Sequence, residues 1–485
     1  MIRSTWCCVW LCATVGCVVG SADSSAPSES ADHKSGGNSI ANDTAFANPS
    51  GQAATFSTTG SVDLGSPFFQ SFGTNGRTCG TCHDPSTGWT ITPGAVQQRF
   101  AATGGTDPIF ALVDGAVSPT ADVSTVAARQ QAYAMLLAKG LIRIGIGIPA
   151  NAEFSLVAVD DPYGFASAQQ LSLFRRPLPS TNLPLLTAVM WDGRETLAGG
   201  DHCNHSDEGG ACFASVDPAD LEDQANGATL GHAQAQFPLT SSQQAAIAQF
   251  EASLYTAQVW DNGAHDLTDA RHAMGGPDAL AAQATYYGIN DNLGDYQTGA
   301  PFSAVIFTEY SAWRGAPGGG VEAARAAIAR GEDIFNSRPI TISGVGGLNA
   351  GGPFNPPLPA SFTGTCGTCH DTPHAGDHSI AAPLDIGLVD ASQRTPDLPL
   401  YTLRNNTTGE TRQVTDPGRA LITGKWADIG KFKGPILRGL AARAPYFHNG
   451  SAADLDAVVD FYDQRFGMGL SAQEHSDLVA FLRAL

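Results

Sequence analysis

The chain has 485 residues, a formal net charge of −20 at pH 7 and a hydrophobic content of 42%. This length is sufficient for two or three domains, each with its own core. The acidic surface excludes nucleic acid as a partner, because a phosphate backbone requires basic side chains. The charge favours solubility first, and it also suits a small basic partner protein.

Residues 1–20 have the features of an export signal. Arg3 is followed by an apolar run from Trp6 to Val15 and then by small residues. The run is too short to span a bilayer stably, so we expect export to the periplasm. Cys17 stands where bacterial lipoproteins are lipidated, and two alternatives remain equal: simple cleavage, or a lipid anchor as the only attachment to a membrane.

Residues 21–61 are rich in Ser, Ala, Asn and Gly and predict a disordered tether. Order is expected to begin near Val62. The glycine-rich run Arg314–Gly320 predicts a linker between two domains, which would then span residues 62–314 and 321–485.

A stretch of mixed character lies within the first predicted domain. Residues 124–139 have a helical pattern that ends before Gly140. In residues 141–159 isoleucines alternate with other residues, which predicts a hairpin or a pair of short strands. We interpret this stretch as an insertion on the first domain.

The ten cysteines fall into three groups. Four lie in the export signal, and four form two C-x-x-C-H motifs. Cys203 and Cys212 remain, and in an oxidising compartment this pair predicts a disulfide that closes a short loop. Metal binding by the same loop is the less favoured alternative.

The heptapeptide Thr78–Asp84 recurs unchanged as Thr365–Asp371, and each copy contains C-x-x-C-H. Thiols at this spacing can bond the vinyl groups of one haem, and the histidine that follows then lies beneath the iron. Zinc would need four converging ligands, whereas each motif supplies three adjacent ones. The duplication therefore predicts two covalently bound haem c groups, attached through Cys79, Cys82, Cys366 and Cys369.

Three amphipathic helices are expected in the second domain. Residues 321–335 have one such pattern, Ser451 and Asp454 predict the capped start of a second helix, and Ser471 and Glu474 form a capping box before a third. With the haem motifs, these helices predict a mainly α fold. We expect two cytochrome c-like helical haem domains, with a mixed loop and short-strand insertion on the first.

Longer motifs then occur in a recognisable order: Trp191–Arg194, Leu221–Gln224, Phe432–Leu440, Ala444–Ser451 and Leu455–Tyr462. With them the chain resembles the bacterial di-haem cytochrome c peroxidase superfamily, including its methylamine-utilisation branch, over most of its length. The resemblance implies a haem-dependent oxidoreductase that uses a small oxidant such as hydrogen peroxide and a small electron-donor protein. Some members of the superfamily also hold calcium.

The resemblance also implies iron ligands. His83 and His370 would be the proximal ligands of the first and second haem. Tyr462 falls where the peroxidases have a methionine and the methylamine-utilisation branch a tyrosine bound to the second iron. Met468 is nearby and remains a rival ligand.

Catalytic roles follow from the same resemblance. Trp191 matches a tryptophan that relays electrons between the haems, and Gln224 matches a glutamine on the distal side of the first haem. The expected catalytic glutamate is replaced by Gln234, and an amide cannot shuttle a proton. His232 could do so, or it could instead ligate the iron and close the site.

The first haem is expected to be open. No histidine occurs between Asp84 and Asp201, so the resting distal histidine of the peroxidases is missing, and Arg99 stands at the matching distance. These features favour a peroxidase-type enzyme with an open first haem and an electron-transfer second haem. A non-catalytic di-haem electron-transfer protein is the alternative, which Gln234 favours.

Overall fold

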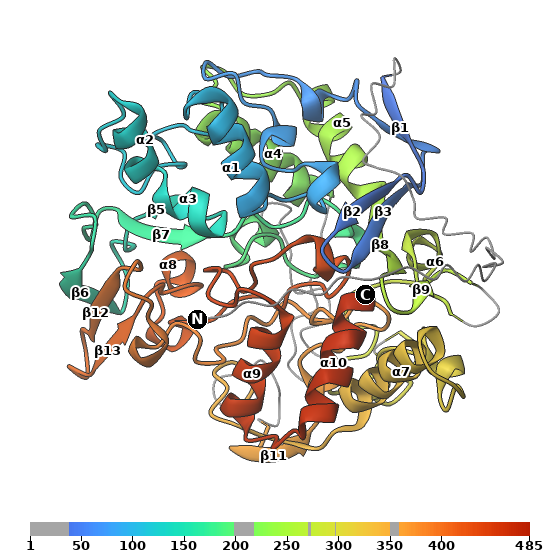
Figure 1. Cartoon of the computed structure of the whole chain (residues 1–485). Helices are drawn as coiled ribbons and strands as arrows, with labels where there is room; N and C mark the ends of the chain where they lie inside the picture. The colour runs from blue at the N-terminus through green and yellow to red at the C-terminus, as the bar shows by residue number, and fades with distance from the viewer. Residues whose placement is uncertain (1–37, 198–217, 270–272, 296, 350–357) are drawn as a thin grey trace, which may run out of the picture. The chain divides into compact units, whose positions relative to one another are not determined.

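Helices and strands alternate along much of the computed structural model (Figure 1). The model describes residues 38–197, 218–269, 273–295, 297–349 and 358–485. Of these residues, 32% are helical and 18% lie in strands or bridges, so the prediction of a mainly α fold is wrong. The physical reason is that strands form from segments whose small residues are typical of loops.

Two expectations lie outside the described residues, namely the export signal with Cys17 and the disulfide between Cys203 and Cys212. In the part of the chain that the structure describes, no helix has both the length and the apolar character needed to cross a membrane. Residues Ser39–Leu485 form one compact unit.

A four-stranded antiparallel sheet contains much of the predicted tether. Its order is β2 (Ala45–Asn48), β3 (Gly51–Ser57), β8 (Leu254–Asp261) and β9 (His265–Asp266), and a separate pair joins β1 (Ser39–Ala41) to β4 (Ser61–Asp63). Ala53 and Ala54 are buried, because small side chains allow close packing against the central strand. The tether prediction therefore does not hold for residues 39–61.

Five helices follow in the first half: α1 (Pro93–Thr103), α2 (Val126–Ala132), α3 (Ala134–Lys139), α4 (Pro218–Gly231) and α5 (Ser241–Ala252). The helix expected over 124–139 is divided at Tyr133, whose hydroxyl donates to the Phe110 carbonyl at 2.7 Å. Gly140, with a φ of 60°, ends α3 in the left-handed conformation that glycine accepts readily.

The alternating residues 141–159 form strands that belong to different sheets. β5 (Ile142–Ile146) pairs with β7 (Leu171–Arg175). β6 (Phe154–Asp160) pairs with β12 (Leu400–Asn405), which also pairs with β13 (Thr411–Val414). The two segments are therefore strands but not a hairpin. The second sheet joins segments from both of the domains expected from the sequence.

The second half contains the helices expected there. α7 (Val321–Ser337), α9 (Leu455–Phe466) and α10 (Ala472–Ala484) share one hydrophobic core, in which Phe335, Val459 and Phe481 are buried. Ser471 and Glu474 form the predicted capping box of α10. The N-cap of α9 is Asp454 rather than Ser451. The remaining regular elements are α6 (Pro277–Ala281), α8 (Ala420–Thr423), β10 (Ile340–Ser343) and β11 (Ser361–Gly364).

Candidate haem and peroxide site

One cavity of about 420 Å³ is lined by both C-x-x-C-H motifs. Every residue that the sequence analysis selected for catalysis, haem attachment or iron ligation also lines this cavity. The set is Cys79, Cys82, His83, Trp191, Gln224, His232, Cys366, Cys369, His370, Tyr462 and Met468. Residues that lie up to several hundred positions apart in the sequence are therefore brought together around a single space.

The two motifs share one local geometry. In each, the first Cys begins a short 3₁₀ helix, and the preceding threonine donates its backbone N–H to the hydroxyl of the threonine three residues later. The histidine N–H then donates to the carbonyl of the first Cys at 3.0 Å in both copies. None of these four cysteines forms a disulfide. The repeated sequence thus produces a repeated turn.

Each motif histidine is also held in the same way. His83 Nδ1 donates to the Trp89 carbonyl at 3.1 Å, and His370 Nδ1 donates to the Gly376 carbonyl at 2.6 Å. Both accepting residues follow their histidine by six positions and have a positive φ, 62° for Trp89 and 70° for Gly376. A hydrogen bond at Nδ1 leaves Nε2 as the atom that can bind a metal, and it fixes the orientation of the ring.

The electrostatic surroundings of these groups suit neutral ligands. Burial lowers the pKa of His83 to about 4 and also lowers the pKa of His370, so both imidazoles are neutral, which is the form that binds iron. Burial raises the pKa of Cys79 and of Cys366 to about 12. Among the described residues no cluster of three or more His, Cys, Asp or Glu side chains could hold a metal ion. The paired thiols, the oriented imidazole and the apolar walls fit haem c.

One face of α4 forms a wall of the cavity. Leu221, Gln224, Ala225 and Ala228 recur at helical spacing in α4 and line the same space as His83. His232 directly follows the last residue of α4 and lines this space too.

His232 is the outer member of a hydrogen-bonded triad. Its Nδ1 donates to Asp114 Oδ2 at 2.5 Å, and Asp114 Oδ1 accepts from Arg77 Nη1 at 2.5 Å. Burial alone would raise the pKa of Asp114, but His232 and Arg77 lower it below the ordinary value. The carboxylate is therefore ionised and fixes the His232 ring, whose Nε2 has no hydrogen bond to another described residue. Asp114 and Arg77 were not identified from the sequence, because no motif links positions so far apart.

Gln234 and Arg99 do not line the cavity. The Gln234 carbonyl accepts from the Thr74 hydroxyl at 3.1 Å, and its residue is exposed. The Arg99 guanidinium pairs with Asp107. Neither residue substitutes directly for a distal group of the peroxidases.

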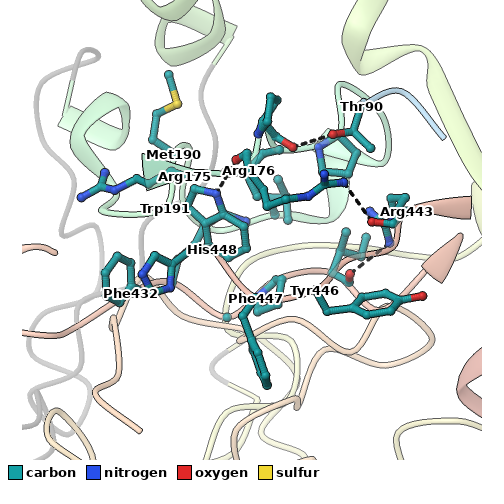
Figure 2. A pocket seen from close by; sticks show the side chains of 18 of the residues that line it. Thr90, Arg175, Arg176, Met190, Trp191, Phe432, Arg443, Tyr446, Phe447 and His448 are labelled. Atoms are coloured by element: carbon teal, nitrogen blue, oxygen red, sulfur yellow. Dashed lines mark hydrogen bonds between the residues drawn. The ribbon is translucent and has the colours of Figure 1, made fainter. Parts of the chain in front are cut away.

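Trp191 lies on the cavity wall and is fixed at both ends. Its indole Nε1 donates to the Arg176 carbonyl at 2.8 Å, and its own carbonyl accepts from Lys433 N at 2.9 Å. The ring of His448 lies 6.2 Å from the indole, edge to face, and stacks on Phe432 at 4.1 Å (Figure 2). His448 is buried, and its Nε2 has no hydrogen-bond partner.

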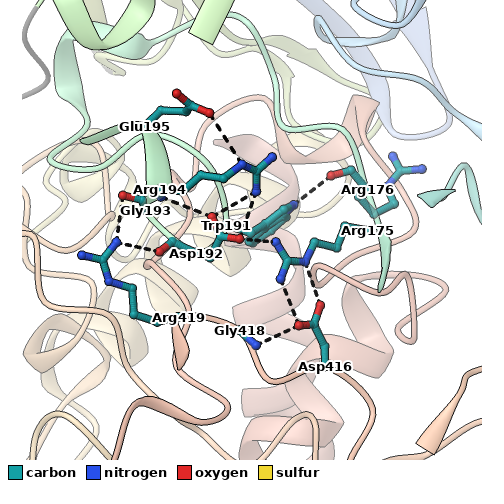
Figure 3. A network of polar contacts seen from close by, with 10 residues as sticks. All are labelled: Arg175, Arg176, Trp191, Asp192, Gly193, Arg194, Glu195, Asp416, Gly418 and Arg419. Atoms are coloured by element: carbon teal, nitrogen blue, oxygen red, sulfur yellow. Dashed lines mark hydrogen bonds and ion pairs between the residues drawn. The ribbon is translucent and has the colours of Figure 1, made fainter. Parts of the chain in front are cut away.

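The residues beside Trp191 anchor it through ion pairs (Figure 3). Asp192 is fully buried and pairs with Arg175 at 2.6 Å and with Arg194 at 2.9 Å, while Arg175 also binds Asp416. Arg419 donates to the Asp192 carbonyl. The short motif Trp191–Arg194 thus contacts segments from both halves of the chain.

The two rival ligands of the second haem, Tyr462 in α9 and Met468 after it, both line the cavity. The Tyr462 ring is 6.4 Å from the ring of His370, and burial raises its pKa above the ordinary value. Its hydroxyl has no hydrogen-bond partner among the described residues. Met468 is buried just beyond the helix in the same cluster of apolar residues. Both side chains remain available as ligands.

Comparisons with known proteins agree with these motifs. No protein-family model matches the chain. A cytochrome c peroxidase, IdrP1, of Pseudomonas sp. (strain SCT) is 36% identical over 148 residues, which is 26% of this chain and 38% of the relative. A second, IdrP2, of Denitromonas iodatirespirans is 38% identical over 136 residues, or 26% and 37% of the two chains.

The chain thus spans less than two fifths of the length of these curated relatives. A cytochrome c551 peroxidase of Nitrosomonas europaea is 39% identical over 69 residues, 14% of this chain and 21% of that one. Among solved structures, a MauG-like protein associated with microbial copper homeostasis aligns with 66% of this chain and 76% of its own, at 16% identity and a TM-score of 0.31. The curated relatives, all cytochrome c peroxidases, confirm the resemblance to the di-haem cytochrome c peroxidases.

Proposed function

We propose that this protein is an exported, periplasmic peroxidase that carries two covalently bound haem c groups. It would reduce hydrogen peroxide with electrons from a small donor protein. The observation that carries the proposal is the single cavity lined by both C-x-x-C-H motifs and by a histidine–aspartate pair. The sequence similarity to cytochrome c peroxidases supports the same class of enzyme.

The cofactors would be held by residues already described. Cys79 and Cys82 would bond the first haem, with His83 as its proximal ligand. Cys366 and Cys369 would bond the second, with His370 on one side and Tyr462 or Met468 on the other. Haem iron, when bound, supplies the peroxide-binding and one-electron chemistry, and its axial ligands set its potential.

The chain's own residues supply proton transfer. The ionised Asp114 orients His232 so that Nε2 is the atom that can take up or release a proton. Gln224, which lines the same cavity from α4, would hold water by hydrogen bonds through its amide. This pair would do the work of the glutamate that Gln234 replaces.

Trp191 is the candidate route for electrons between the two centres. Its ring is fixed by hydrogen bonds and by the buried Asp192 beside it. A rigid indole needs little reorganisation, which suits a relay. The alternative, a non-catalytic electron-transfer protein, is favoured by one observation, the exposed position of Gln234 outside the cavity.

The test uses full-length protein matured in a host that attaches haem c. Mass spectrometry gives the haem count, and electron paramagnetic resonance gives the spin state of each iron. We expect two haems, one high-spin ferric signal and turnover of hydrogen peroxide. Two low-spin signals without turnover would favour the electron-transfer alternative.

A variant separates the proton-transfer role from haem binding. His232→Ala should keep both haems and lose about 100-fold in kcat/KM for peroxide, because general acid–base catalysis contributes about that much or more. His475→Ala is the matched control, since His475 pairs with Asp460 at the protein surface. Equal loss in both variants, or none in either, would exclude the role of His232.

A further inference from the structure

Five buried cations line the same cavity among the described residues, and three of them form no ion pair: Arg176, Lys433 and Arg443. Their exposed fractions are 5%, 7% and 8%. We call them the cavity cations. Burial of a charge is costly unless an opposite charge or several hydrogen bonds compensate for it.

Among the described residues, only neutral groups accept hydrogen bonds from the guanidinium groups of Arg176 and Arg443. Arg176 donates to the carbonyls of Lys139, Ile91 and Arg443 at 2.7–3.0 Å. Arg443 donates to the main-chain carbonyls of Gly439, Ile436 and Arg438, which all precede it in the chain. The ammonium of Lys433 has no hydrogen bond to a described residue. None of the three has a carboxylate within 4 Å in the described part of the chain.

The other arginines of the cavity differ in this respect. Arg77 pairs with Asp114, Arg175 with Asp192 and Asp416, and Arg194 with Asp192. The protein thus supplies a carboxylate for each of these arginines and none for the cavity cations. The difference points to an anion that the polypeptide does not provide.

The cavity cations also repel one another. Burial lowers the pKa of Arg443 to about 10, and burial together with the charge of Arg443 lowers the pKa of Arg176 to about 10. Burial and Arg443 together lower the pKa of Lys433 to about 8, against the attraction of Asp377. An anion among the three would relieve this repulsion.

Trp191 bonds the main chain of two cavity cations. The Arg176 carbonyl accepts from the indole (Figure 2). Lys433 N donates to the Trp191 carbonyl. Arg176 in turn reaches the Arg443 carbonyl at 3.0 Å. The main chain thus links Arg176 and Lys433 directly to Trp191, and Arg443 through the Arg176 guanidinium.

We infer that the cavity cations bind the propionate carboxylates of the haem groups. The inference rests on the proposed function, because it requires haem in the cavity. A propionate edge is an anion that arrives together with an apolar ring, which fits a mostly apolar cavity with a few buried cations. It also explains why these cations, which are more than nine-tenths buried, have no carboxylate of their own.

Redox titration of the haem-loaded, full-length protein tests the inference. Arg443→Gln and Lys433→Met should each lower the midpoint potential of at least one haem, because a nearby cation stabilises the reduced iron. Arg443→Lys keeps the charge and should restore most of the parent value. In resonance Raman spectra, the propionate bending bands should shift in the same variants.

Arg143→Gln is the matched control. Arg143 is 3% exposed, has two nitrogens without partners and does not line the cavity. Its replacement should leave both potentials and the propionate bands unchanged. Lys433→Met should fold like the parent, since it replaces an unpartnered buried ammonium by an apolar group of similar length.

The outcomes separate this inference from the proposed function. Unchanged potentials and Raman bands in Arg443→Gln and Lys433→Met, with both haems and peroxide turnover retained, would overturn the propionate site alone. Absence of covalent haem from the parent protein would overturn the proposed function instead. Equal shifts in the control and in the cavity variants would also contradict the inference.

Discussion

Asp114 binds two side chains at once. It accepts from Arg77 and from His232, and only 4% of its surface is exposed. Asp114→Asn should leave Arg77 as a buried, uncompensated cation and lower the free energy of unfolding by about 3–5 kcal/mol. Urea denaturation of the haem-loaded protein, followed by circular dichroism, measures this loss.

Asp107 offers the control for that substitution. It pairs with Arg99, and the two side chains are 19% and 30% exposed, so the ion pair is screened by solvent. Asp107→Asn should cost about 1 kcal/mol or less. If both variants lose the same amount, the buried triad contributes nothing beyond an ordinary surface pair.

The buried Glu251 should make the stability of the protein depend on pH. It is buried in α5, one of its oxygens has no partner, and burial raises its pKa from 4.5 to about 7. The folded state therefore holds a proton that the unfolded state releases. Stability should fall as pH rises from about 4.5 to about 7, by about 3 kcal/mol in total.

The Glu251→Gln variant checks this sign. An amide does not titrate, so the difference in unfolding free energy between pH 5 and pH 8 should shrink relative to the parent. Urea titrations at the two pH values measure it. A pH dependence identical in both proteins would show that Glu251 is not the group responsible.

At the residue scale, the sequence predicted what a short motif encodes. Cys79, Cys82 and His83 lie in one turn, so their geometry follows from local sequence. The partners of His232 and Trp191 could not be predicted in this way. Asp114 and Arg176 are brought to them by folding, and one sequence carries no signal of such distant pairs.

At the level of secondary-structure elements, close contact between α7 and α10 depends on Gly331. A Cβ at this position would lie 2.0 Å from the Asp477 carbonyl oxygen and 2.6 Å from Phe481 Cβ. Gly331→Ala should therefore lower the free energy of unfolding by at least 1–3 kcal/mol, although alanine is the better helix former. Thermal and urea unfolding both measure this change.

Gly227 in α4 provides the control for the Gly331 substitution. A Cβ there would meet nothing within 4 Å, so Gly227→Ala should raise stability by about 0.5–1 kcal/mol through helix propensity alone. The two substitutions are chemically identical and are expected to have opposite signs. The same sign in both would contradict the packing argument.

The elements that the sequence predicted well have strong local signals. α7, α9 and α10 show apolar residues at helical spacing, and α10 begins with a capping box. The strands β1 to β4 were missed, because Ser, Ala and Gly in a short strand resemble a loop. β5 and β6 were expected as strands, but their partners β7 and β12 follow from tertiary packing and not from the turn between them.

At the scale of the whole molecule, the chain from Ser39 onward is one compact unit. The sequence suggested two haem domains separated at residues 314–320. Strands β6 and β12 pair across that division, and Gln258 in β8 donates its N–H to the carbonyl of Leu485. The two haem motifs therefore share a cavity because the segments that carry them are interleaved.

The central position of β3 indicates that residues 39–57 stabilise this compact unit. β3 lies between β2 and β8, and Thr55 in it accepts from the Trp89 indole at 2.9 Å and shares a hydrogen bond with Thr256. Removal of residues 39–57 would leave β8 as an unpaired edge and the indole without its acceptor. We expect the shortened chain to accumulate little haem-loaded protein, or to unfold at clearly lower urea.

Thr44→Ala is the control, because the Thr44 hydroxyl bonds only the nearby Ala41 carbonyl in an exposed turn. It should change the unfolding free energy by less than about 1 kcal/mol. Unfolding is followed at once by haem absorbance and by circular dichroism, and in the parent protein both should report one coincident transition. A shortened chain as stable as the parent would mean that this segment is dispensable, as a tether would be. Two separate transitions in the parent would instead mean that the haem-bearing segments fold independently, despite the strands that join them.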